Sequence, residues 1–191
     1  LDSATLRENV VSLARNIGYV PRSKTAARAS IKFQVPTNTS SPTLTLQPGI
    51  VCVGTQDDTD FVFSISESIT TTVNNGFAQF GTVEEPIKVL EGTYLTTKFT
   101  VDGSLEQRFI LDNSSIDSSS IVVYVKHADE EGLGKQYKLI DNIVNISTIS
   151  ETYLIQEVQD EKYELLFGDD IFGRKLKDGE VITVQYVITS G

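Results

Sequence analysis

The sequence predicts a mainly β protein with a short N-terminal helical segment (α+β), whose strands form an antiparallel β-sandwich or two small β-subdomains. Three observations carry this prediction. Apolar residues near the N-terminus recur at helical spacing, and from Ile31 onward they alternate at a period of two. Turn-forming residues separate about ten short runs rich in Val, Ile, Thr, Tyr and Phe. Such spacing is typical of antiparallel architectures.

The N-terminal segment is predicted to be a helix over residues 4–17. Gly18 and the nearby Pro21 end it. Ser23 is then expected to cap a second short helix over 24–29, so residues 1–30 form a helix-turn-helix lead-in. The apolar stripe of the first helix comprises Leu6, Val10, Leu13, Ala14 and Ile17.

The β region is expected to begin at Ile31 and to divide near 112–120, a segment rich in Ser and Asp. Residues 31–111 would form a first β-subdomain and 112–191 a second, with a short helical turn in the loop between them. Segment 66–76 is either an exposed strand or a loop. Strands are expected over 31–35, 44–46, 50–53, 61–65, 78–83, 87–90, 94–101, 109–111, 121–125, 135–139, 153–159, 162–167 and 181–188.

The net charge and the lengths of the apolar runs argue against nucleic-acid and membrane partners. The chain has 16 Lys and Arg against 26 Asp and Glu, a net charge of −10. Nucleic-acid binding requires clustered cations, so we expect no such partner. No apolar run reaches the length of a membrane span, so we expect no membrane partner. The chain contains no Met and starts at Leu1, which predicts a segment cut from a longer protein.

Carboxylates are plentiful, but histidine and cysteine are scarce, and we expect no enzyme and no cofactor. The single histidine, His127, is expected to lie in a solvated loop, and the single cysteine, Cys52, in a short buried strand. Neither a G-x-G-x-x-G nor a Walker motif is present.

The segment 167–173, Phe-Gly-Asp-Asp-Ile-Phe-Gly, is the most suggestive candidate site. Its adjacent carboxylates, Asp169 and Asp170, could hold a hard cation such as calcium or act in catalysis. A tight turn, in which Gly takes positive φ and Asp bonds the backbone, is the favoured interpretation.

Two blocks resemble a known family. Leu6-Arg7, Gly18-Tyr19 and Pro21-x-Ser23 at the N-terminus, together with Phe167-Gly168-Asp169, resemble baseplate wedge proteins of contractile-tailed (T4-like) bacteriophages, relatives of the baseplate J family. The proline-glycine turn at 47–49 and the final strand over 184–191 are also similar, whereas 57–149 matches only in general β character. The N-terminal block is the specific part.

The resemblance implies a mechanical function. This chain would be an internal fragment of a structural protein in the virion tail baseplate, assembled in the host cytoplasm. Its partners would be other wedge proteins and further copies of itself, in a homodimer or higher assembly that closes a ring around the tail hub. The matched residues would set the fold, since the family has no catalytic residues, and the Phe167–Asp169 segment would shape a hairpin.

Two other functions stay open. The Thr- and Ser-rich β region also fits a carbohydrate- or receptor-binding β-sandwich module, although the chain has no Trp for stacking on sugars. A hydrolase built on carboxylates ranks last, because no nucleophile, base and orienting group occur together.

Overall fold

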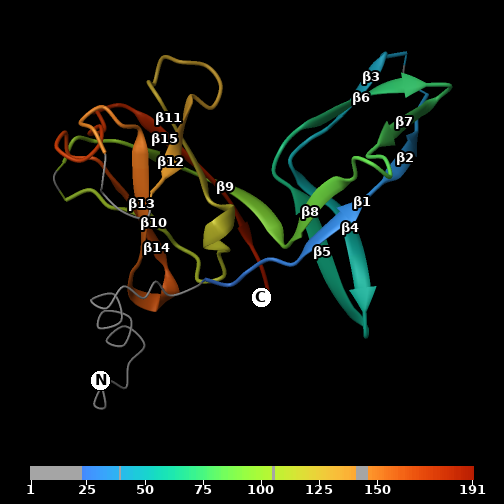
Figure 1. Cartoon of the computed structure of the whole chain (residues 1–191), viewed down its shortest axis with the longest axis horizontal. Coiled ribbons are helices and arrows are strands. Elements are labelled where there is room, and N and C mark those ends of the chain that lie inside the picture. Colours follow the sequence, from blue (N-terminus) through green and yellow to red (C-terminus); the bar gives the residue numbers. More distant parts are fainter. Residues whose placement is uncertain (1–22, 39, 105, 141–145) are drawn as a thin grey trace.

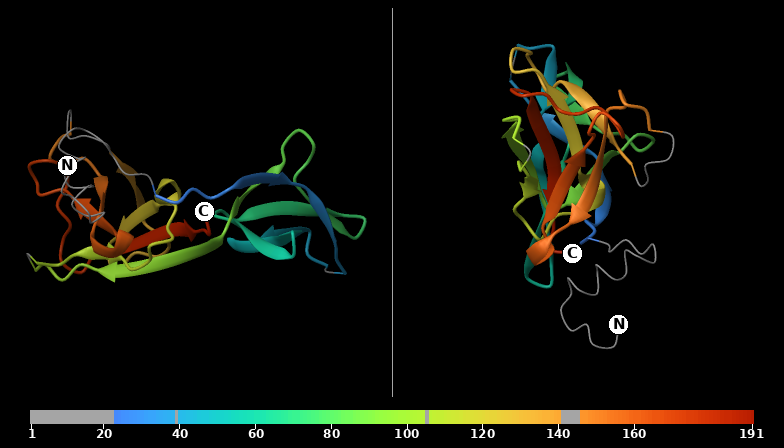
Figure 2. Two further views of the ribbon diagram at one scale, coloured as in Figure 1. Left: turned by 90° about the horizontal axis from the view of Figure 1, so that it is seen from below. Right: turned by 90° about the vertical axis from the view of Figure 1, so that its left-hand side faces the viewer.

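The computed structural model describes residues 23–38, 40–104, 106–140 and 146–191. Their strands build two lobes arranged end to end (Figures 1 and 2). The mainly β class with antiparallel sheets is confirmed. No helix within these ranges is long and apolar enough to cross a membrane. The helix expected over 4–17 lies outside the described residues.

The first lobe consists of two four-stranded sheets with matching strand orders, β1-β8-β5-β4 and β2-β7-β6-β3. Strands at the same place in the two orders follow each other along the chain: β1 and β2, β7 and β8, β5 and β6, β3 and β4. The lobe is therefore one four-stranded antiparallel layer that is interrupted and bent across its middle. The strands are β1 (Arg28–Ile31), β2 (Phe33–Pro36), β3 (Thr43–Leu46), β4 (Gly49–Gln56), β5 (Thr59–Ile65), β6 (Ile69–Asn74), β7 (Phe77–Phe80) and β8 (Ile87–Glu91).

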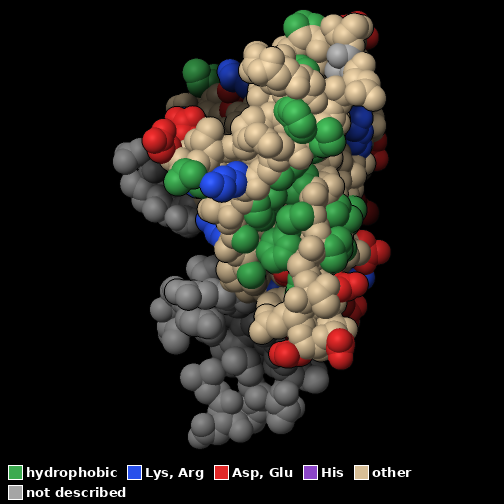
Figure 3. Space-filling view, turned by 90° about the vertical axis from the view of Figure 1, so that its right-hand side faces the viewer, with side chains coloured by type: hydrophobic (Ala, Val, Ile, Leu, Met, Phe, Trp, Pro, Cys, Tyr) green, Lys and Arg blue, Asp and Glu red, His purple; other side chains and the backbone are tan. Residues whose placement is uncertain are grey.

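Alternation gives this bent sheet one apolar face. In β2, Phe33 and Val35 are half-buried whereas Gln34 is exposed, as the sequence pattern predicts. A single bent layer covers its apolar face incompletely, and hydrophobic side chains gather in a patch on the end of this lobe (Figure 3). The buried core residues are Ile65, Ala78, Phe80, Ile87 and Val89.

The second lobe is a seven-stranded sheet in the order β10-β14-β13-β12-β11-β15-β9. All its pairs are antiparallel except β12 with β13. The larger of the two hydrophobic cores lies here, and β15 contributes most to it, with Ile182, Val184 and Tyr186 buried. The strands are β9 (Thr93–Thr100), β10 (Phe109–Leu111), β11 (Val122–Lys126), β12 (Lys135–Leu139), β13 (Thr152–Glu157), β14 (Tyr163–Phe167) and β15 (Val181–Ile188).

The lobes divide at Gly92 and not near residue 112. β9 and β10 precede the expected seam but belong to the second lobe, because β9 pairs with β15 along its full length, from Thr93↔Ile188 to Thr100↔Val181. The Ser-rich segment is a loop of the second lobe, and its expected helical turn is the 3-10 helix η1 (Ser118–Ser120).

The short helix expected over 24–29 is absent. Residues 23–27 have no regular structure and β1 starts at Arg28. The alanines indicated a helix, but Ala29 pairs with Val89 and Ala26 is buried at the start of the sheet. Tertiary pairing therefore overrides helix propensity here.

The structure also corrects the expected burial of β4 and decides between strand and loop for segment 66–76. β4 was expected to be buried, yet Ile50 and Val53 are 54% and 57% exposed, since β4 is an edge strand with a bulge between Ile50 and Cys52. Segment 66–76 contains the strand β6, which lies inside its sheet between β7 and β3.

Among the glycines that the structure describes, Gly92 leaves the least room for a side chain. Its φ is +116°, and a Cβ there would lie 2.1 Å from the carbonyl oxygen of Ile188. We expect Gly92→Ala to lower the free energy of unfolding by about 3–5 kcal/mol, measured by urea denaturation followed by circular dichroism. Gly49→Ala is the matched control, because Gly49 has φ +135° but no atom within 4 Å of that Cβ. It should cost about 1–2 kcal/mol, and equal losses would contradict the steric argument.

Candidate functional site

Four segments meet where the lobes join: residues 23–27, 91–93, 113–120 and 188–191. We call this region the junction. The first segment leads into β1, the second is the crossing between the lobes, the third contains η1, and the fourth follows β15 to the C-terminus. Buried polar groups from different segments hydrogen-bond to one another here.

Glu91 is the acidic residue at the crossing. It is 8% exposed, and its carboxylate accepts hydrogen bonds from the hydroxyls of Thr189 and Ser190. Its N–H donates to the carbonyl of Ala27 at 2.8 Å. One residue therefore connects the end of β8 to the chain entering β1 and to the C-terminal segment.

Asp117 organises the opposite side of the junction. It is 1% exposed, and its two carboxylate oxygens accept from different segments. Oδ2 accepts the N–H of Ala26 at 3.0 Å, and Oδ1 accepts the N–H and the hydroxyl of Ser119 at 2.9 and 2.6 Å. Its own N–H donates to the carbonyl of Val187 at 3.0 Å. Asp117 thereby caps η1 and holds the chain that enters the first lobe.

Ser23 contributes to the same region instead of capping a helix. Its hydroxyl oxygen accepts the N–H of Ser118 at 2.9 Å and lies 2.8 Å from the hydroxyl of Ser118. Leu6, Arg7, Gly18, Tyr19 and Pro21, the other N-terminal residues of the family-like motif, lie outside the described residues.

A cleft of about 560 Å³ lies beside the junction, between the lobes. Residues of β1 and β8, with Ser66, line it from the first lobe, and residues of β9, η1, β11 and β15 line it from the second. Burial raises the pKa of the Tyr94 phenol in this cleft to about 12, with Tyr124 contributing. The lining residues are Arg28, Ala29, Ser30, Ser66, Lys88, Val89, Leu90, Tyr94, Ser119, Ser120, Val122, Gln185 and Val187.

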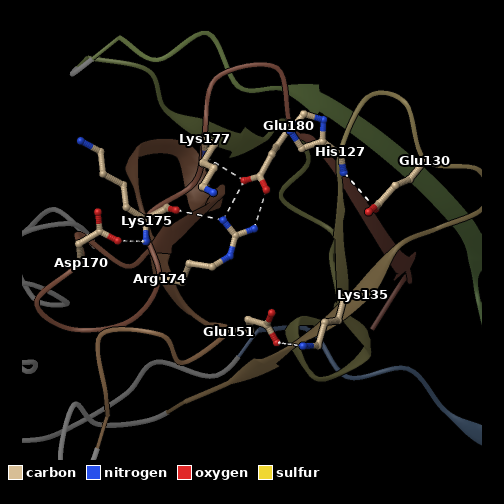
Figure 4. Close-up of polar contacts among 9 residues, drawn as sticks. All are labelled: His127, Glu130, Lys135, Glu151, Asp170, Arg174, Lys175, Lys177 and Glu180. Atoms are coloured by element: carbon tan, nitrogen blue, oxygen red, sulfur yellow. Dashed lines mark hydrogen bonds and ion pairs between the residues drawn. The ribbon is translucent and has the colours of Figure 1, made fainter.

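Arg174 and Glu180 form a partly buried ion pair in the second lobe (Figure 4). The guanidinium contacts both carboxylate oxygens, at 2.6 and 3.1 Å, and lies 5.8 Å from the centre of the Tyr137 ring. The N–H of Lys177 donates to the same carboxylate at 2.8 Å. With its acceptors occupied in this way, Glu180 closes the turn that leads into β15 and has a structural role.

The segment 167–173 is a turn built by its own carboxylates. Oδ1 of Asp169 accepts the N–H groups of Ile171 and Phe172, and Oδ1 of Asp170 accepts the N–H of Lys175 at 2.9 Å. A Cβ on Gly168 would lie 2.2 Å from the backbone of Gly173, so the two ends of the turn touch.

The hairpin expected at Phe167–Asp169 is not formed. β14 pairs with β10 and β13 whereas β15 pairs with β11 and β9, so the turn connects strands that are not neighbours. Phe167 packs in the core, with its ring centre 5.5 Å from that of Phe109. In the described part of the chain, no group of three or more His, Cys, Asp and Glu residues could hold a metal ion.

The remaining candidates lie apart. His127 follows β11 in the second lobe and is exposed, with its N–H donating to Glu130 at 3.2 Å. Cys52 is half-buried in β4 of the first lobe. They cannot act as a Cys–His pair, because they belong to different lobes.

No protein-family model matches this sequence, and no curated protein matches it either.

Sequence reasoning missed the residues that build the junction. Glu91 and Gly92 fall between the strands expected over 87–90 and 94–101, and Asp117 falls in the loop expected over 112–120. One signal was available, because the Asp-Ser-Ser-Ser run over 117–120 has the composition of a helix cap. No local signal indicates its contact with Ala26, which is 91 residues away.

Asp117→Ala should loosen the junction specifically. The substitution leaves the N–H groups of Ala26 and Ser119 without their acceptor, and we expect a loss of about 2–3 kcal/mol in unfolding free energy. Hydrogen exchange should accelerate at Ala26 through local opening of the junction, and at Val123, in the core of the second lobe, only as far as global stability falls. Asp112→Ala is the control, because Asp112 is exposed and pairs with Lys162 at the surface. Equal acceleration at Ala26 in both variants would contradict this role.

Two buried carboxylates, those of Glu164 and Glu180, should make the free energy of unfolding fall as the pH becomes acidic. Hydrogen bonds from Arg108 lower the pKa of Glu164 below its ordinary 4.5. Burial by itself would raise the pKa of Glu180, but hydrogen bonds from Arg174 and Lys177 outweigh it and lower that pKa as well. The unfolded chain therefore takes up protons first as the pH falls below about 4.5, so these contributions are complete above that pH and are lost below it.

The measurement is urea unfolding between about pH 6 and about pH 3. Glu180→Gln and Glu164→Gln should each lower stability at neutral pH and flatten its decline in acid. Glu131→Gln, in an exposed loop, should keep the wild-type slope. A slope unchanged in both buried-site variants would exclude these carboxylates as its source.

Proposed function

We propose that this chain is a structural component of a contractile-tail baseplate wedge, with no catalytic activity and no cofactor. The observation that carries the mechanical part of the proposal is the buried junction. The family assignment rests on the resemblance at Leu6-Arg7, Gly18-Tyr19 and Pro21-x-Ser23.

The junction suits a part that must pass force or position between two binding surfaces. Domains joined by one linker ordinarily move relative to each other. Here the lobes are joined at Gly92, and the first lobe is also held by the bonds of Ala26 to Asp117 and of Glu91 to Thr189. Hinging would break these contacts together, so a displacement of one lobe moves the other.

The partners follow from this proposal. The chain would contact other wedge proteins and further copies of itself, in a homodimer or larger assembly within the tail baseplate, after assembly in the host cytoplasm. The exposed apolar residues on both lobes, such as Val53 in the first and Phe172 in the second, provide contact area for such partners.

The carbohydrate-binding alternative is less well supported. Sugar recognition commonly uses exposed aromatic side chains that act together. Among the described aromatic residues only Phe77 and Phe172 are exposed, and they belong to different lobes. Specific binding on a glycan array would favour this alternative.

Reconstitution with the neighbouring tail proteins encoded by the same genome tests the proposal. We expect the chain to enter a stable wedge complex, seen by size-exclusion chromatography and cryo-electron microscopy. Gly92→Ala should reduce incorporation, because a Cβ forced against the carbonyl oxygen of Ile188 displaces the lobes relative to each other. Gly49→Ala should incorporate to a much greater extent. A wild-type chain that stays outside every tail complex would contradict the proposal.

A further inference from the structure

We propose that the cleft between the lobes receives the acidic β4–β5 turn of a second copy of this chain. The inference deepens the assembly role proposed above by naming one contact surface and its occupant. It depends on that role for its biological meaning, but purified protein is sufficient to test it.

The charge of the cleft is opposite to that of the chain. The chain carries a net charge of −10, yet the residues that line the cleft include two cations, Arg28 and Lys88, and no carboxylate. Neither cation forms an ion pair with another residue in the described ranges. Glu67 lies near Tyr94 but outside the lining. A partly enclosed site of this kind favours an anionic occupant.

Strand register places the two cations together. Ser30 is directly opposite Lys88 and Arg28 is directly opposite Leu90, so both cations and Ser30 are on the same face of the β1–β8 pair. Ser119 and Gln185 line the wall contributed by the second lobe. The cleft therefore offers two charged donors and several neutral hydrogen-bonding groups to one ligand.

The β4–β5 turn has the complementary chemistry. Asp57 and Asp58 form its two-residue tip with φ values of 48° and 61°, enclosed by the pair Gln56↔Thr59. Positive φ at both positions is the geometry of a type I′ turn, which holds the carboxylates in a fixed arrangement. The hydroxyl of Thr55 donates to Asp60 at 2.6 Å and supports the base of the turn.

The shapes of the hairpin and the cleft are also complementary. The β4–β5 hairpin projects beyond the rest of the first lobe (Figure 1), so its tip can enter another molecule. The cleft volume of about 560 Å³ falls within the range of roughly 300–1,000 Å³ found for sites that enclose a ligand. The turn is pre-organised by seven residue pairs between β4 and β5, which lowers the entropy lost on binding.

Each copy carries one turn and one cleft, so the contact is heterologous. Successive copies then form a closed ring if the rotation between them closes, and an open filament if it does not.

Sedimentation velocity on charge-reversal variants tests the contact. In the cleft variant, Arg28→Glu with Lys88→Glu, the turn and cleft are both acidic. In the turn variant, Asp57→Lys with Asp58→Lys, both are basic. Each variant alone should associate at least about tenfold more weakly than the wild type, whose association should itself weaken as salt is raised. An equimolar mixture should associate again, because every turn then finds a cleft of opposite charge.

The control is Lys98→Glu with Lys138→Glu, which makes the same change in net charge at exposed positions outside the cleft. It should associate as the wild type does, and circular dichroism should show that all variants are folded. A wild type that stays monomeric, a cleft variant that associates as tightly as the control, or a mixture that stays dissociated would each overturn the inference. Self-association without incorporation into a tail would contradict only the proposed function.

Discussion

The close approach of Gly92 to the carbonyl of Ile188 is the constraint on which the rest of the structure depends. A chain that leaves β8 and enters β9 must pass β15 at this point, and only a residue without a side chain fits. That contact brings Glu91 beside Thr189 and aligns β9 with β15 over their full length. The lobe boundary, the burial of Glu91 and the position of the cleft all follow from it.

β15 links this constraint to the core. Its alternation puts Ile182, Val184 and Tyr186 into the largest hydrophobic cluster, while its backbone pairs with β9 and β11. The strand therefore holds the second lobe together and ends at the junction. β15 therefore connects the junction to the centre of the sheet as one continuous hydrogen-bonded strand.

The strands were predictable because their signals are local. Alternation in Phe33–Pro36 and the β-branched run of β15 specify strands without knowledge of a partner. Contacts between distant residues were not predictable in this way. The alanines around Arg28 indicate a helix, because nothing nearby in the sequence shows that β8 will pair with Ala29. The Ser-rich loop resembles a domain seam, because its bond to Ala26 spans 91 residues.

The cationic cleft between the lobes was not predictable for a related reason. Net charge describes the whole chain, whereas recognition depends on which charges stay available after folding. Arg174 is committed to Glu180 and Arg108 to Glu164, so these cations are neutralised within the second lobe. Arg28 and Lys88 are left together by the β1–β8 register in a cleft without a carboxylate in its lining. An acidic chain can therefore present a cationic site to an acidic partner, and its own β4–β5 turn carries the carboxylates that such a site binds.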